Sequence, residues 1–145
     1  MKARISVITL GVRDLEESLE FYRDGLGLQT RGIIGSEFKG DETHAGGKAV
    51  MFELDGGLIL ALYGRRDLAL DANEPIGTSG SAEFSIGHLV RSREEVDLLM
   101  KQALSAGAMV TEEPYERPWG IYSGYFKDPD GHLWEIIWNP QFPVE

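Results

Sequence analysis

The chain has 145 residues, of which 42% are hydrophobic and 26% are charged, and its formal net charge is −10. This length suits one domain with a hydrophobic core. A strongly acidic chain without a large cluster of Lys and Arg repels phosphate backbones, so we expect no nucleic-acid partner. The absence of cysteine from the sequence excludes disulfides, thiolate metal ligands and cysteine nucleophiles.

Apolar runs in the chain have the length of strands. The run at residues 58–63 is typical, and it is far too short to span a bilayer. The first residues lead directly into a strand-like run and lack the apolar region of a signal peptide. We therefore expect no membrane partner and a cytoplasmic location.

The first half predicts a strand, a helix and three further strands. Residues 4–12 alternate in the manner of a strand. Asp14 followed by Glu17 is an N-cap signal, and the helical spacing of apolar residues continues to Gly27, which is typical of a helix end. Three strands are then predicted, at residues 28–34, 49–54 and 58–63. Residues 55–57, Asp-Gly-Gly, predict a hairpin turn between the last two.

The second half repeats this order. Residues 83–90 predict a strand, Ser92 with Glu95 predicts a helix N-cap, and Gly107 ends that helix as Gly27 ends the first. Three strands follow, at residues 109–112, 122–127 and 133–138. The last two are joined by a turn at 128–131, Asp-Pro-Asp-Gly.

This repeat predicts the architecture. We predict an α+β fold of two βαβββ modules, at about residues 4–63 and 83–139, within one domain of residues 1–145. Residues 64–82, rich in Gly, Ser, Asp and Asn, are the predicted linker. Because one helix covers only one face of a module's sheet, we expect two curved mixed sheets to close around a cavity.

Two motifs carry a family resemblance. Residues 12–18, Val-Arg-Asp-Leu-Glu-Glu-Ser, are followed by Phe-Tyr at 21–22 and Leu-Gly at 26–27, and residues 128–135 read Asp-Pro-Asp-Gly-His-Leu-Trp-Glu. They resemble the opening and closing signatures of the vicinal-oxygen-chelate superfamily, which includes glyoxalases, bleomycin resistance proteins and dioxygenases. The resemblance covers almost the whole chain and implies the glyoxalase/bleomycin-resistance fold. It implies little about the reaction, since that fold hosts many chemistries.

The resemblance also implies four metal-ligand positions, one on the first and one on the last strand of each module. They fall on Val7, Leu60, Ser85 and Glu135. Valine and leucine cannot coordinate a cation, and a serine hydroxyl is a poor ligand at neutral pH. We therefore predict no metal centre and no other cofactor.

The predicted cavity face is mostly apolar with a few polar groups, the composition of a small-molecule site. The candidates for ligand contact are Thr9, Leu60, Ser85, Trp119, Tyr122, Tyr125 and Glu135. Trp119 and one of the two tyrosines are the candidates for stacking on a ligand, whereas edge-strand packing or a dimer contact would equally explain this aromatic run.

Glu135 is the candidate catalytic residue. Without a metal, a carboxylate among apolar neighbours loses hydration and needs a partner. It could act as a general base, anchor a cationic or hydrogen-bond-donating ligand, or accept internal hydrogen bonds from Thr9 and Ser85. The sequence leaves these three roles open.

The three histidines are weaker candidates for a ligand-binding or catalytic role than Glu135. His88 is predicted on the face opposite Ser85, packed between sheet and helix. His132 lies in a turn and is expected to be exposed. His44 lies in the loop at 35–48, where a solvated side chain is favoured over a ligand contact.

We therefore predict a metal-independent protein that binds a small organic molecule. The alternative is a lyase, isomerase or dioxygenase of the same superfamily that uses Glu135, although no electrophile is evident without a metal. The polar groups on the predicted cavity face disfavour a purely structural module. Relatives commonly pair two chains, and twofold dimers are the commonest soluble oligomers, so we expect a homodimer.

Overall fold

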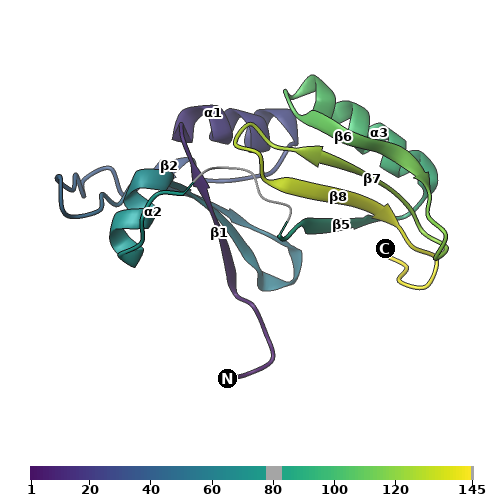
Figure 1. Ribbon diagram of the computed structural model, residues 1–145, viewed down its shortest axis with the longest axis horizontal. Helices are drawn as coiled ribbons and strands as arrows, with labels where there is room; N and C mark the ends of the chain where they lie inside the picture. Colours follow the sequence, from purple (N-terminus) through teal and green to yellow (C-terminus); the bar gives the residue numbers. More distant parts are fainter. Residues whose placement is uncertain (78–82, 145) are drawn as a thin grey trace. The chain divides into compact units, whose positions relative to one another are not determined.

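The structure, a computed structural model, describes residues 1–77 and 83–144. It contains two compact units, Met1–Thr78 and Ser79–Glu145, and each unit has one four-stranded sheet (Figure 1).

The first unit follows the predicted order of strand, helix and three strands, with one further helix. Its elements are β1 (Val7–Val12), α1 (Leu15–Leu19), a π-helical segment (Glu20–Gly25), β2 (Ile33–Ile34), β3 (Ala49–Glu53), a 3-10 turn (Asp55–Gly57), β4 (Ile59–Gly64) and α2 (Arg65–Ala72). The strand order is β1-β4-β3-β2, with β1 parallel to β4 and the other pairs antiparallel.

The second unit has the same topology. Its elements are β5 (Ile86–Val90), α3 (Arg93–Ser105), β6 (Met109–Glu116), β7 (Tyr122–Lys127) and β8 (Leu133–Trp138). The strand order is β5-β8-β7-β6, with β5 parallel to β8. The predicted α+β class and the repeated βαβββ module are confirmed.

Local signals in the sequence explain where the two main helices begin and end. The Glu17 amide donates to the Asp14 carboxylate at 3.0 Å, and the Glu95 amide donates to the Ser92 hydroxyl at 3.1 Å. Each hydrogen bond satisfies an amide that the helix itself leaves free. Gly27 and Gly107 follow the two helices with φ of +80° and +108°, a backbone region that favours glycine.

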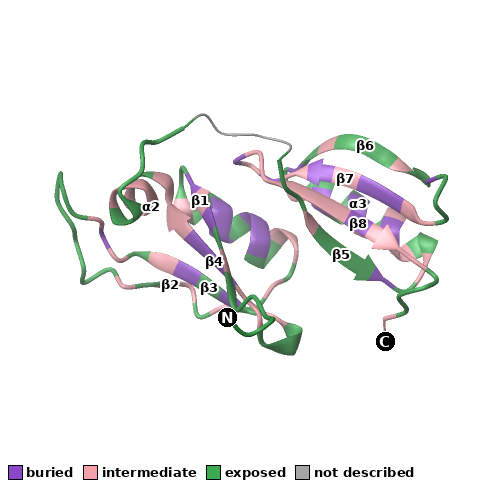
Figure 2. Ribbon diagram, turned by 60° about the horizontal axis from the view of Figure 1, so that its bottom comes forward, coloured by how far each residue is buried: buried purple, intermediate pink, exposed green. Residues whose placement is uncertain are grey.

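Each unit buries the sheet face that its helix covers. In the first unit, Leu10 and Phe52 are 2% and 0% exposed, and in the second unit Phe126 and Ile136 are 1% and 2% exposed. Figure 2 shows buried residues in α1, α3 and the inner strands, whereas much of β5 and β6 is exposed. In each unit the main helix covers one face of the sheet and leaves the other face uncovered by that helix, as the sequence predicts.

The predicted linker is partly helical, which corrects the prediction for residues 64–77. Residues Arg65–Ala72 form α2, and Asn73 ends it in the left-handed region with φ of 54°. Alanine, leucine and arginine in this stretch are good helix formers, and their preference outweighs the turn-rich composition of the longer segment. Residues 78–82 of the predicted linker lie outside the described residues.

α2 also holds the preceding loop. The Gly46 amide donates to Asp67 of α2 at 2.8 Å, and the Tyr63 hydroxyl donates to the Gly46 carbonyl. Gly11 allows the close approach of α2 to β1, since a Cβ at this position would lie 3.3 Å from side-chain atoms of Arg65 and Leu68. The loop at 35–48 is thus tied to the first unit.

Four strands differ from the prediction by more than one residue. β1 and β5 begin at Val7 and Ile86 rather than at residues 4 and 83, and β2 and β6 differ as follows. β2 has only two residues, because Thr30 donates its hydroxyl to the Met51 carbonyl and Gly32 adopts φ of 84° before the strand begins. β6 continues past the predicted end at 112, with shifts in its pairing to β7.

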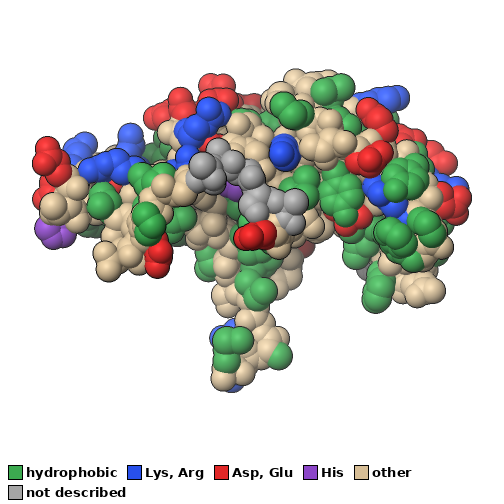
Figure 3. All heavy atoms as spheres, in the orientation of Figure 1, with side chains coloured by type: hydrophobic (Ala, Val, Ile, Leu, Met, Phe, Trp, Pro, Cys, Tyr) green, Lys and Arg blue, Asp and Glu red, His purple; other side chains and the backbone are tan. Residues whose placement is uncertain are grey.

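The surface agrees with the net charge of −10. Acidic side chains are spread over both units on the face that Figure 3 shows, interspersed with basic ones. Within residues 1–77 and 83–144, no helix has the length and apolarity needed to cross a membrane.

Candidate functional site

The pairing of β8 places Glu135 on the sheet face that α3 leaves free. Glu135 pairs with Tyr125 on β7 and with Gly87 on β5, and directly paired residues share a face. Ile136, the next residue, belongs to the buried core at 2% exposure. This open face of the second unit is the face on which the sequence predicts Glu135.

The carboxylate of Glu135 has a fixed hydrogen-bond partner. The Ser123 hydroxyl donates to its Oε2 at 2.7 Å, and Ser123 is fully buried. The same hydroxyl accepts from Nε of Arg117 at 3.2 Å. A relay from Arg117 through Ser123 therefore orients the half-buried carboxylate. Hydrogen bonds from Thr9 and Ser85 were one of the three roles that the sequence left open for Glu135.

Arg117 is itself buried, at 9% exposure. It donates to the Ser123 carbonyl at 3.1 Å and to the Tyr115 hydroxyl at 2.7 Å. Its guanidinium lies over the rings of Tyr115 and Tyr125, at 3.9 Å and 5.4 Å from their centroids, an arrangement that attracts a cation to the ring faces. These contacts fix Tyr125 beside Glu135.

The turn after β6 brings Arg117 to this position. The Gly120 amide donates to the Arg117 carbonyl at 3.0 Å, and the Arg117 amide donates to the Ile121 carbonyl at 2.7 Å. Gly120 has φ of +91°, which permits a turn this tight. The chain then enters β7, so the Arg117 side chain lies along the start of that strand.

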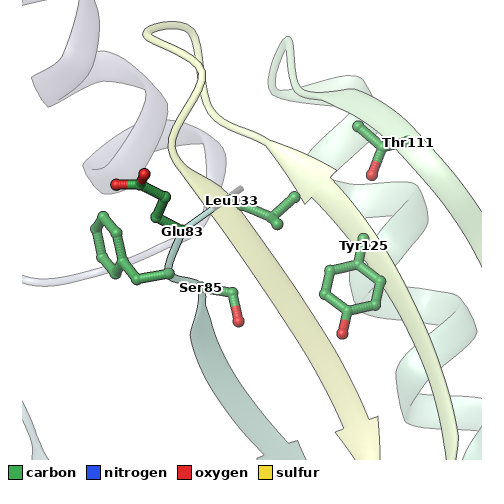
Figure 4. A pocket seen from close by; sticks show the side chains of 6 residues that line it. Glu83, Ser85, Thr111, Tyr125 and Leu133 are labelled. Atoms are coloured by element: carbon green, nitrogen blue, oxygen red, sulfur yellow. The ribbon is translucent and has the colours of Figure 1, made fainter. Parts of the chain in front are cut away.

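A hollow of about 440 Å³ lies on the second unit next to this relay. Its lining residues are Glu83, Phe84, Ser85, Thr111, Tyr125 and Leu133. Figure 4 shows them around the start of β8, with Ser85 on the β5 side and Tyr125 on the β7 side. Glu135 is not part of this lining, but it pairs with Tyr125 and lies two residues after Leu133 on the same face, so it borders the hollow.

The pKa of the Tyr125 hydroxyl depends on the residues around it. Burial raises the pKa of Tyr125, the negative charge of Glu135 raises it further, and Arg117 acts in the opposite direction. We expect Glu135→Gln to lower the pKa of Tyr125, because the phenolate no longer faces a carboxylate. Ultraviolet titration of tyrosinate absorbance measures this shift, and Tyr125→Phe identifies the titrating group. An unchanged tyrosine titration in Glu135→Gln would contradict this electrostatic coupling.

Two aromatic candidates lie away from the hollow. Tyr122 lies on the helix side, where its hydroxyl donates to Asp97 of α3 at 2.7 Å; this hydrogen bond is the main cause that raises the pKa of Tyr122 to about 12. Its predicted place on the ligand face is wrong, because strand alternation turns it away from Ser123 and Tyr125. Trp119 is 70% exposed in the turn, and its contact with a ligand stays a prediction.

The predicted position of Leu60 is also wrong. Leu60 pairs with Ile8 and is 1% exposed on the helix side of the first unit. Thr9, which is exposed on the other face, pairs with Ala61. The residue on the open face that corresponds to Glu135 is therefore Ala61.

The hairpin turns explain this error of one residue. Glu53 pairs with Ile59, and Lys127 pairs with Leu133. The two turns therefore match with Gly57 on Gly131, which have nearly equal φ of +91° and +93°. If Asp55-Gly56 is matched with Asp130-Gly131 instead, β4 shifts by one residue relative to β8. A shift of one residue exchanges the two faces of the strand.

The four family metal positions are thus Val7, Ala61, Ser85 and Glu135. Two hydrocarbon side chains and one hydroxyl leave a single carboxylate, a donor set that does not fit a divalent metal ion. Within the described part of the chain, no three His, Asp or Glu side chains lie close enough together to hold a metal ion.

The histidines have separate structural surroundings. His88 pairs with Ile136 on the helix side as predicted, but much of its side chain is exposed instead of packed. The protein that surrounds part of its ring lowers its pKa by desolvation. His132 is less exposed than expected: its Nδ1 lies 2.6 Å from Oδ2 of the buried Asp128, and its side chain is 18% exposed. His44 is exposed, with Nδ1 3.1 Å from Asp41 Oδ1.

A second hollow, of about 430 Å³, lies on the first unit. Its lining residues are Gln29, Thr30, Arg31, Gly32, Ile34, Met51 and Glu53. Thr9, the remaining site candidate of this unit, is not among them.

Comparison with known families agrees with this geometry. The profile of the glyoxalase/bleomycin resistance protein/dioxygenase superfamily matches residues 4–136. The chain belongs to this superfamily. No curated protein matches the chain significantly.

Several solved structures are similar to this chain over nearly its whole length. A glyoxalase-related enzyme from Fulvimarina pelagi has 29% identity and a TM-score of 0.82, with 99% of this chain and 93% of that chain covered. A hypothetical protein from S. aureus has 27% identity and a TM-score of 0.75, with 96% and 95% covered. A fosfomycin resistance protein from Listeria monocytogenes has 22% identity and a TM-score of 0.66, with 96% and 95% covered, and supports the fold alone.

Sequence reasoning missed Arg117 and Ser123 as site residues. Alternation along residues 122–127 could have identified Ser123, since it shares a face with Tyr125. Arg117 had no such signal, because its position depends on the turn that ends β6.

Proposed function

We propose that this superfamily member binds a small organic molecule on the open face of the second unit, beside Glu135 and without a metal. The observation that supports this is the Glu135 carboxylate, which Ser123 and Arg117 orient at the border of a hollow of about 440 Å³. A fixed carboxylate accepts N–H or O–H groups of a ligand, while Tyr125 and Leu133 offer apolar surface.

Other candidates contribute to different degrees. Ser85 and Tyr125 line the hollow and bring hydroxyl groups to it. Trp119 and Thr9 are exposed, and we keep them as candidate contacts outside the hollow. We do not propose Leu60 or Tyr122 as ligand contacts, because both lie on the helix sides of their sheets.

An enzymatic role is the second candidate, because the Fulvimarina pelagi structure is named as a glyoxalase-related enzyme. Glu135 would then act as a general base on the bound molecule. Incubation of the protein with its ligand separates the two functions: a binding protein returns the ligand unchanged, whereas an enzyme converts it.

The decisive experiment is mass spectrometry of small molecules that copurify with the protein, followed by thermal denaturation with each one. A ligand at 100 times its dissociation constant adds about 2.7 kcal/mol to the free energy of unfolding. We expect Glu135→Gln to lose most of that increment. A ligand that stabilises the protein and the Glu135→Gln variant equally would contradict the proposed site.

The same preparation tests the absence of a metal. We expect less than one Zn, Ni, Fe or Mn ion per chain and an unchanged melting temperature in a chelator, because Val7 and Ala61 offer no donor atoms. One tightly bound ion per chain that is lost in Glu135→Gln would overturn this part of the proposal.

We further propose that the protein is a homodimer, since closed twofold assemblies are the commonest among soluble oligomers. Light scattering at micromolar concentration is expected to give twice the chain mass of 16.1 kDa. A mass equal to one chain would refute this assembly.

A further inference from the structure

Gly87 leaves the space beside Glu135 open. On β8, Glu135 has Tyr125 as its partner on one side and Gly87 on the other. Among the described residues other than its two chain neighbours, a Cβ at Gly87 would have one atom within 4 Å, Cδ1 of Ile137 at 3.3 Å. The strand position next to the carboxylate is thus free of a side chain.

The backbone does not require glycine at this position. Gly87 is not among the glycines with positive φ, and glycine within a strand weakens it, which often marks the close approach of another group. The first unit supports this reasoning, because its corresponding position is Thr9, which carries a side chain and pairs with Ala61. The equivalent strand of the first module, β1, therefore accepts a branched residue at this position.

The polar groups around this space favour a hydrogen-bond donor. Glu135 is held by Ser123, and the buried cation of Arg117 directs its hydrogen bonds to Ser123 and Tyr115 rather than to the space over Gly87. Glu83, in the lining of the adjoining hollow, adds a second carboxylate. A ligand carboxylate or phosphate placed here would meet like charge, whereas an N–H or O–H group would meet an oriented acceptor.

We infer that the space over Gly87, bounded by Glu135 and Ile137, receives an uncharged or cationic donor group of the ligand, such as an amine, amidine or hydroxyl, and rejects anionic groups. Gly87 is then the residue that determines which ligand reaches Glu135. This inference rests on the proposed function and names the chemical class of the ligand at that site.

The test uses three probes that share a phenyl ring: benzamidinium, phenol and benzoate. Titrations of the full-length protein, followed by amide chemical shifts, are expected to show benzamidinium and phenol perturbing Gly87 and Glu135, with benzoate at least about tenfold weaker. Glu135→Gln should weaken benzamidinium by about tenfold or more, the usual effect of losing a charged acceptor. Benzoate binding as tightly as benzamidinium, or no perturbation by any probe, would overturn the inference.

Gly87→Val fills the space with a side chain that strands favour, and it is expected to abolish the perturbation by all three probes. Met51→Val, at an exposed strand position that pairs with Ala61 on the open face of the first unit, is the control and should leave them unchanged. Gly87→Ala serves if the valine variant does not fold, and it should weaken benzamidinium at least threefold. A folded Gly87→Val or Gly87→Ala variant with wild-type affinity refutes the inference.

The copurifying ligand separates this inference from the function itself. Loss of that ligand in Glu135→Gln but not in folded Gly87→Val would sustain the proposed site and refute the role of Gly87. No binding of any small molecule to the wild-type protein would refute both.

Discussion

Leu60→Ala is expected to lower the free energy of unfolding by about 2–5 kcal/mol, the range for truncating a fully buried leucine. Leu60 is 1% exposed and pairs with Phe52 and Ile8 on the helix side of the first sheet. Truncation removes apolar contacts and leaves a cavity that the surrounding strands cannot close. Denaturant unfolding followed by circular dichroism measures the change.

Val7→Ala is the matched control for Leu60→Ala. Val7 is on the other face of the same sheet and is 48% exposed, so its truncation is expected to cost less than about 1 kcal/mol. If Leu60 were on the open face, the two variants would have similar effects. A cost for Leu60→Ala as small as that for Val7→Ala would therefore reject the register of β4.

Arg117→Met is expected to lower the free energy of unfolding by about 2–4 kcal/mol and to weaken ligand binding. Methionine keeps much of the apolar length of arginine but donates no hydrogen bonds. The fully buried Ser123 then loses the donors to its hydroxyl and its carbonyl, and unsatisfied buried acceptors are costly. Binding weakens because Ser123 and Tyr125 no longer have a fixed neighbour to hold them beside Glu135.

Arg117→Lys separates charge from geometry. Lysine keeps the cation but lacks the planar fork that reaches Ser123 and Tyr115 together. We expect a stability between those of the wild type and Arg117→Met, and a ligand affinity closer to that of the methionine variant. Wild-type stability and affinity in Arg117→Met would show that the relay does not support the site.

Much of the fold follows from patterns that are local in the sequence. Asp14 and Ser92 cap their helices because a short polar side chain reaches the free amides three residues later. Gly27 and Gly107 end them because glycine accepts positive φ. The order of these signals, repeated once, suffices to predict two βαβββ modules.

The candidate site was predictable only in part. Glu135 and Ser85 were predicted on the open face from the family ligand positions and from strand alternation, which has a period of two residues. Tyr122 was kept as an alternative to Tyr125, although three residues of separation place the two on opposite faces. Strand alternation alone would therefore have placed Tyr122 on the helix side, where its hydroxyl donates to Asp97.

By itself, the sequence determined the modules and the ends of their main helices, because each depends on residues within a few positions of one another. The face of Glu135 was implied by the family resemblance. Only the tertiary structure decided that Ala61 rather than Leu60 corresponds to Glu135, since two similar turns can be matched in two ways and one residue of shift exchanges the faces. It also decided the role of Arg117, because a turn with positive φ at Gly120 sets which side chain of β7 the guanidinium meets. Such contacts depend on how separate strands pair, which no local pattern encodes.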